Sequence, residues 1–207
     1  MLWSFVAMAQ YNIDRLLIIG RNALYFEDYV LSIQYFNQAI NAKPYLYEPW
    51  FYRAVAKYNL DDFIGAETDC SQAISINPFI TNIYELRGLA RIQQQKFGDA
   101  ISDYNKALKY DPENQSLWHN RVLCRIQNKE YDTALCELDT MLTRWKRYAR
   151  GYAMQAEVYM HKEDTTKAIK SLNQSIDIDP YESSTWQALA GISLSRKKWK
   201  DAEKNLD

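Results

Sequence analysis

Four of the five prolines recur at a fixed spacing along this 207-residue chain. Pro44, Pro78 and Pro112 lie 34 residues apart, and Pro180 follows after 68 residues, which is two further steps of the same length. Proline lacks an N–H group and disfavours helical geometry in the residue before it, so it marks places where a helix ends. A fixed period in the range of roughly 20 to 50 residues indicates a stack of repeated structural units.

The 34-residue spacing divides the chain into six copies that agree at several positions. The copies cover residues 13–46, 47–80, 81–114, 115–148, 149–182 and, in part, 183–207, after an apolar segment at residues 1–12. Position 4 is aromatic in five copies, which hold Trp50, Tyr84, Trp118, Tyr152 and Trp186. Positions 8 and 20 are mostly small. Large and small residues spaced four apart share one helical face, so each copy is expected to form two closely packed helices.

The composition agrees with a helical chain and excludes several other classes. Only 6 glycines and 5 prolines are present, whereas turn-rich β folds need such residues at every corner. A hydrophobic share of 47% with 25% charged residues is typical of a folded protein with a sizeable core. The net charge of −1 gives no electrostatic basis for binding nucleic acid, and no apolar run approaches the length of a transmembrane span.

The copies resemble the tetratricopeptide repeat (TPR), and the resemblance covers residues 13–207. The clearest copy reads YELRGLARIQQQKFGDAISDYNKALKYDPEN, from Tyr84 to Asn114. The resemblance, which is to TPR proteins of bacterial type, implies an all-α fold. It is a right-handed superhelix, or α-solenoid, of antiparallel helix pairs with about six TPR motifs. The pentatricopeptide relatives that read RNA usually have a basic surface, which the net charge of −1 disfavours.

Two further positions vary together among the copies. Position 7 is arginine and position 23 is acidic in copies 2, 3 and 4 only. The pairs are Arg53 with Asp69, Arg87 with Asp103, and Arg121 with Glu137. We interpret them as partly buried structural ion pairs that fix the register of the two helices. The alternative is two unrelated solvated positions.

The resemblance also implies a concave surface lined by the first helix of each repeat. Its positions in copies 1 to 4 hold mainly apolar and amide side chains. They are Arg21 and Tyr25; Phe51, Val55, Tyr58 and Asn59; Glu85, Leu89, Ile92 and Gln93; and His119, Leu123, Ile126 and Gln127. Such a groove suits a peptide with apolar anchors. Alternatively, the apolar residues at position 12 pack only between neighbouring first helices.

Chaperone-binding members of the family hold a C-terminal carboxylate with Lys at position 5 and Asn at position 9 of one repeat, then Lys and Arg two repeats later. Those places hold Leu17 with Arg21, and Glu85 with Leu89; shifting the frame by one copy does not restore the pattern. We therefore expect no chaperone-tail carboxylate clamp.

Residues for catalysis, metal binding or cofactor binding are not recognisable. His119 and His161 lie in different copies without a paired ligand spacing, and the glycines are scattered singly. Cys70, Cys124 and Cys136 form no CxxC motif and are expected to be buried as small apolar residues. The sequence thus predicts a protein–protein interaction scaffold that is not an enzyme and uses no cofactor. The alternative is a structural spacer or regulatory module of a larger exported or envelope-associated protein.

The two ends and one junction depart from the pattern. Residues 1–9 resemble the end of a bacterial signal peptide, which favours export to the periplasm or envelope over a cytoplasmic location; a capping helix is the alternative. Copy 6 stops within its second helix, which suggests a fragment of a longer array or self-association through the open half-repeat.

Lys146 replaces the periodic proline, so the preceding helix is expected to run longer and change the pitch of the superhelix. The cations from Arg144 to Arg150 around it suggest either an acidic-partner site or a solvated turn.

Overall fold

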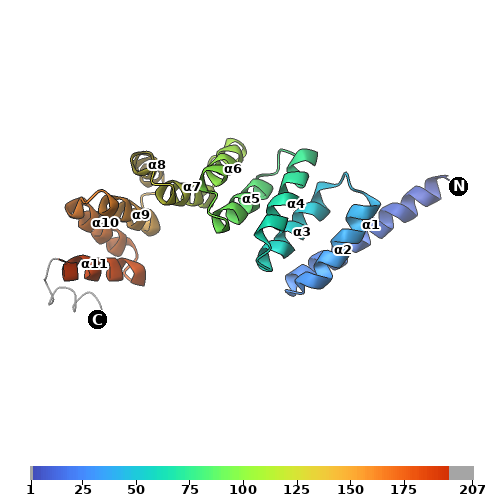
Figure 1. Ribbon diagram of the computed structural model, residues 1–207, viewed down its shortest axis with the longest axis horizontal. Helices are drawn as coiled ribbons and strands as arrows, with labels where there is room; N and C mark the ends of the chain where they lie inside the picture. Colours follow the sequence, from blue (N-terminus) through green and yellow to red (C-terminus); the bar gives the residue numbers. More distant parts are fainter. Residues whose placement is uncertain (1, 196–207) are drawn as a thin grey trace. The chain divides into compact units, whose positions relative to one another are not determined.

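A computed structural model describes the backbone of residues 2–195 and the side chains of residues 12–194. Eleven helices and no strand are present in this part of the chain (Figure 1). The helices are α1 (Leu2–Tyr25), α2 (Tyr29–Ala42), α3 (Tyr47–Asn59), α4 (Phe63–Ile76), α5 (Thr81–Gln93), α6 (Phe97–Tyr110), α7 (Gln115–Gln127), α8 (Tyr131–Arg144), α9 (Ala149–His161), α10 (Thr165–Ile178) and α11 (Ser183–Ser195). The predicted all-α repeat fold is confirmed. The incomplete end of copy 6, including Ala202, lies outside the described residues.

The helices pack in two compact units, Met1–Leu117 and Trp118–Asp207. In the first unit α1 packs on α2, α3 on α4 and α5 on α6, and α2 also contacts α3 and α4 also contacts α5. The second unit repeats this arrangement with α8 on α9, α9 on α10 and α10 on α11. Helices α3, α5, α7, α9 and α11 begin at residues 47, 81, 115, 149 and 183, which are position 1 of copies 2 to 6.

One turn geometry ends the first helix of copies 1 to 5. Position 15 is left-handed, with φ between 59° and 62°, at Glu27, Asp61, Gln95, Lys129 and Glu163. In copy 2 the N–H of Asp61 donates to the carbonyl of Tyr58 at 3.1 Å, and the N–H of Asp62 donates to that of Lys57 at 2.9 Å. This is the Schellman pattern, which satisfies the last carbonyls of a helix. None of the five residues is glycine, so each turn is held against the steric preference of its own side chain.

The residue after the left-handed position also begins the second helix. Asp28, Asp62 and Asp164 accept hydrogen bonds from backbone N–H groups three residues later, at 2.9–3.1 Å. These are N-cap interactions, which satisfy free donors at the start of a helix. Lys96 and Glu130 occupy the same position in copies 3 and 4 without a side-chain cap. One four-residue turn therefore stops one helix and starts its antiparallel partner.

The expected lengthening at Lys146 is wrong. Helix α8 ends at Arg144 and has 14 residues, the same length as α2, α4, α6 and α10. The N–H of Trp145 donates to the carbonyl of Met141 at 2.7 Å, and the Trp145 ring packs edge-on against Trp118 at 6.4 Å. The aromatic packing and the start of α9 end this helix without a proline.

Close approach of the two helices depends on matched sizes at positions 8 and 24. A Cβ atom on Gly88 would lie 2.8 Å from the buried ring of Tyr104, and one on Gly20 would lie 2.7 Å from the ring of Phe36. Where position 8 is alanine instead of glycine, the residue at position 24 is smaller than these aromatic rings, as with Cys70 opposite Ala54. In copies 1 to 5 a smaller residue at position 8 thus faces a larger one at position 24 across the helix pair.

We expect Gly88→Ala to lower the free energy of unfolding by about 1–3 kcal/mol, because Tyr104 is fully buried and has little room to move. Gly98 is the matched control, since a Cβ atom there meets nothing within 4 Å. Gly98→Ala should raise stability by about 0.5 kcal/mol through its effect on helix propensity. Urea unfolding of the two variants measures both changes. A destabilised Gly98→Ala or an unchanged Gly88→Ala would contradict this account of the packing.

Candidate functional site

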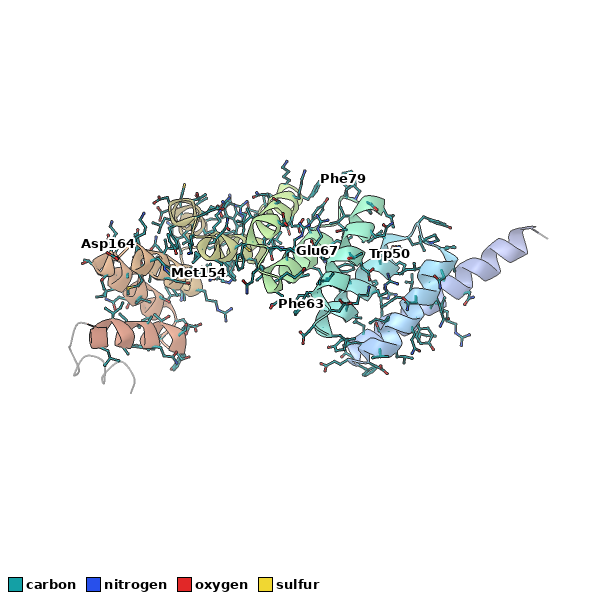
Figure 2. The ribbon with its side chains drawn as sticks, viewed as in Figure 1. Trp50, Phe63, Glu67, Phe79, Met154 and Asp164 are labelled. Carbon is teal, nitrogen blue, oxygen red and sulfur yellow. The ribbon has the colours of Figure 1, made fainter. Side chains whose placement is uncertain are left out.

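The aromatic residues at position 4 tie each helix pair to the turn before it. In copies 2, 3 and 6, Trp50, Tyr84 and Trp186 donate a side-chain hydrogen bond to the carbonyl of the proline six residues earlier. The distances are 2.9 Å for Trp50 (Figure 2), 3.0 Å for Tyr84 and 2.9 Å for Trp186. The proline carbonyl is free to accept because the helix has ended. The spacing of prolines and aromatics is therefore a physical link between copies.

The structure brings together the arginines and acids of copies 2, 3 and 4. Arg53 contacts Asp69 at 2.7 Å, Arg87 contacts Asp103 at 2.6 Å, and Arg121 contacts Glu137 at 3.1 Å. Asp69 and Asp103 are each only 1% exposed. Such carboxylates need a full set of partners, because a buried charge without them costs several kcal/mol.

A second cation, which the sequence analysis missed, contacts each of these acids from position 11. Lys57 lies 2.8 Å from Asp69, Arg91 lies 2.8 Å from Asp103, and Arg125 lies 2.8 Å from Glu137. Positions 7 and 11 are one helical turn apart and therefore share a face. We call this group of two cations and one acid the carboxylate clamp of a copy. Basic residues occupy position 11 in these same three copies, a signal that was available in the sequence.

The clamp arginines also reach the second helix of the preceding copy. Arg53 donates to Asn37 Oδ1 at 2.6 Å, and Arg87 donates to Ser71 Oγ at 3.0 Å. The guanidinium of Arg53 lies 4.8 Å from the centre of the Trp50 ring, within cation–π distance. Arg53 and Arg87 thus fill the grooves between consecutive second helices of the first unit.

Copy 5 keeps these contacts with neutral residues at positions 7 and 23. Gln155 at position 7 donates to Asp139 of the preceding copy at 2.9 Å and accepts from Ser171 at position 23 at 2.7 Å. Tyr159 stands at position 11 in place of a cation. The link between helices is preserved, but the charges and the bulk of the arginine are gone.

Glu67 of α4 extends the charged network between copies 2 and 3 (Figure 2). Its carboxylate accepts from Arg91 at 2.8 Å, from Lys96 at 2.9 Å and from Gln94 at 3.0 Å. Partial burial favours the neutral acid, but these three donors outweigh it together and lower the pKa of Glu67 to about 2.

We expect Glu67→Gln to lower the free energy of unfolding at pH 7 by about 1–2 kcal/mol. The folded pKa lies below the unfolded value, so the carboxylate stabilises the protein above about pH 4.5 and loses this effect as the pH falls toward 2. The difference between variant and parent should therefore shrink over that range in urea unfolding. Glu157→Gln, at an exposed carboxylate, is the control. A difference that does not change with pH would contradict the pKa assignment.

In the first unit the predicted concave residues lie on α1, α3 and α5, and α3 contacts both other helices. Arg21, Asn59 and Gln93 are exposed, and Tyr25 is 81% exposed. The half-buried residues are Phe51, Val55, Tyr58, Glu85, Leu89 and Ile92. Val55 and Tyr58 pack on the core, so position 12 contributes to packing as well as to the surface. Burial, with a smaller contribution from Asp111, raises the pKa of Glu85.

In the second unit the predicted residues differ in accessibility. Ile126 is only 2% exposed and belongs to the core around Leu138, so its place in a groove is wrong. Leu123 is half-buried on the same core, and Gln127 is exposed. His119 is half-buried, with Nδ1 2.7 Å from the hydroxyl of Tyr148. Burial, together with nearby Arg150, lowers the pKa of His119.

A cavity of about 460 Å³ lies beside His119, between α9 and α11. Its apolar lining includes Ala153, Met154 (Figure 2), Met160 and Ala188. The charged groups Arg150, Glu157 and Glu182 and the second histidine, His161, also line it. We call it the concave cavity, because it is lined mainly by the first helices of copies 5 and 6. Of the predicted concave residues, His119 lines this cavity. The same family positions in copy 5 hold Ala153, Glu157, Met160 and His161, which line it as well.

The described residues contain no cluster of His, Cys, Asp and Glu suited to a metal ion.

The three cysteines are free; Cys70 and Cys124 are buried, and burial raises the pKa of both thiols, to about 12 for Cys124. Cys136 is exposed, contrary to expectation. Every helix in the described part of the chain is too short or too polar to cross a membrane.

The geometry defines a helical repeat protein whose copies are antiparallel helix pairs. The tetratricopeptide repeat model matches residues 81–114 and, in a second version, residues 149–182. The chain is a TPR protein.

Solved TPR structures share this fold. The chain resembles the MamA protein with a TM-score of 0.77 and 14% identity, over 84% of this chain and 94% of that one. It resembles YrrB, described as a TPR protein with an unusual peptide-binding site, with a TM-score of 0.76 and 13% identity, over 84% and 89%. The first TPR of Spaghetti (RPAP3), bound to an HSP90 peptide, is 28% identical with a TM-score of 0.54, over 55% and 90%. No curated sequence matches the chain.

Proposed function

We propose that this protein is a non-catalytic scaffold that binds a peptide or protein segment on the concave side of its helix pairs. The concave cavity of the second unit is the main support, because it joins an apolar floor to a few charged side chains. Cavities of this kind bind apolar side chains and orient them with polar groups at the edge. TPR structures with a peptide-binding site are among those that the fold resembles.

The size and charge of the cavity favour an apolar anchor residue within the bound segment. Its floor is formed by methionine and alanine side chains, and methionine adapts easily to different partners. Arg150 lies 3.8 Å from Glu182, a long ion pair at the edge of the site. A segment with one large apolar residue beside polar groups would bury that residue and leave the charges hydrated.

The exposed surface of α1, α3 and α5 is a second concave region, in the first unit. Tyr25, Arg21 and Gln93 offer aromatic and polar contacts there, whereas Val55 and Tyr58 are partly used by the core. We propose that this region assists recognition through polar contacts. Binding of chaperone tails remains disfavoured, because positions 5 and 9 hold Leu17 with Arg21 and Glu85 with Leu89, not the Lys, Asn and Arg residues with which that group binds a C-terminal carboxylate.

The test is a selection of peptides from a random phage-displayed library, followed by calorimetric titration of the best peptide. Ala153→Glu places a carboxylate in the apolar cavity and should weaken binding about tenfold or more, since the buried charge would lose its hydration. Ala42→Glu, at an exposed alanine of α2, should change the affinity less than about twofold.

Circular dichroism of each variant shows whether the fold is intact. Equal affinity of the parent and Ala153→Glu for every selected peptide would refute the concave cavity as the binding site. Failure to select any peptide would favour a structural spacer.

A further inference from the structure

A second cleft, of about 700 Å³, lies on the other side of the second unit. It is bounded by α8 and α10, which are second helices of consecutive copies, and α9 forms its floor. It shares no lining residue with the concave cavity. We call it the outer cleft.

The outer cleft occupies the place that the carboxylate clamp fills in other copies. In copies 2 and 3 the clamp arginine spans from the acid at position 23 to the preceding second helix, and a cation enters from position 11. Copy 5 has Gln155, Tyr159 and Ser171 at positions 7, 11 and 23, and all three line the cleft. Glutamine is shorter than arginine, and serine is shorter than aspartate. The cleft is therefore the volume left by a missing clamp.

Three lysines face the outer cleft, and the clamp acid that would neutralise them is absent. Lys146 and Lys170 have no ion-pair partner among the residues that the structure describes. Lys167 forms an ion pair with Asp164 at 2.8 Å, and Asp164 is labelled in Figure 2. The ammonium of Lys167 also lies 5.4 Å from the centre of the Tyr159 ring. Asp139 is the acidic residue of the lining, and one of its oxygens is bound by Gln155.

We propose that the outer cleft binds an extended acidic segment of a partner protein, with its carboxylates on Lys146, Lys167 and Lys170. Helices α8 and α10 both run antiparallel to α9, so they share a direction. Lys146 follows the end of α8, and Lys167 lies in the first turn of α10, so the two lysines stand toward opposite ends of the cleft. A 14-residue helix is about 20 Å long, a length that roughly six extended residues span.

The polar floor suits a peptide better than a nucleic acid. Tyr152 on α9 and Gln174 on α10 offer hydrogen-bonding groups for a backbone that has no partner of its own. Asp139 in the lining and Asp164 beside Lys167 would repel a continuous run of phosphates, whereas spaced carboxylates can avoid them. This site is independent of the concave cavity and goes beyond the function proposed for it.

The first experiment measures binding of fluorescein-labelled hexaglutamate by fluorescence anisotropy at low salt. The double variant Lys146→Gln/Lys170→Gln should weaken binding about tenfold or more, because two charge-assisted contacts are lost. Lys106→Gln/Lys109→Gln removes the same charge from exposed positions of α6 and should change the affinity less than about twofold. Equal losses in both variants, or no binding to the parent, would overturn the proposal.

The second experiment rebuilds the clamp without changing the net charge. Gln155→Arg/Ser171→Asp should fill the outer cleft and reduce hexaglutamate binding about tenfold, with a melting temperature equal to or above that of the parent. Unchanged binding in this folded variant would contradict the outer cleft as the site. A hexathymidylate that binds more tightly than hexaglutamate would also overturn the proposal. Ala153→Glu in the concave cavity should leave hexaglutamate binding intact, so the two sites are tested separately.

Discussion

The length of each helix is set by the turns at its two ends, and the other regular features depend on those lengths. The left-handed residue at position 15 stops the first helix, and the next residue starts the second. The turn between copies stops the second helix after 14 residues, with proline before α3 or with Lys146 before α9. Because these lengths are the same in copies 2, 3 and 5, position 7 there meets position 23 of its own copy and position 25 of the copy before it.

This constant geometry lets the chemistry at the meeting point change from copy to copy. Arg53 and Arg87 bring a charge that the buried Asp69 and Asp103 require. Gln155 and Ser171 make the same bridge through neutral groups. Neither form leaves a buried polar group without a partner at this point, which is the condition that matters in a low-dielectric interior. Register is therefore maintained by hydrogen bonding, and the charge at the site is free to vary.

The periodic features of the fold could be predicted from the sequence, because each depends on residue types at a fixed spacing. Pro78 and Tyr84 indicated where a helix ends and the next begins, and Arg87 with Asp103 indicated two positions that vary together. The failures concern features that depend on packing in three dimensions. Trp145 ends α8 where proline is absent, and Ile126 turns into the core although Tyr58 at the same position is half-exposed. Spacing alone carries no information on how far a neighbouring side chain covers a surface.

The volumes of the two cavities could not be predicted from the sequence for a related reason, since each volume is defined by side-chain atoms that are missing. The concave cavity exists because Ala153 and Ala188 are small where their neighbours leave space. The outer cleft exists because Gln155 and Ser171 preserve the bridge between helices with less volume than an arginine and an acid. A clamp of two cations and one acid stabilises register but fills the groove between second helices; its neutral replacement keeps the register and opens the groove. A repeat array can thus acquire a ligand site in one copy without disturbing the stacking of the others, provided that the hydrogen-bonded bridge is retained.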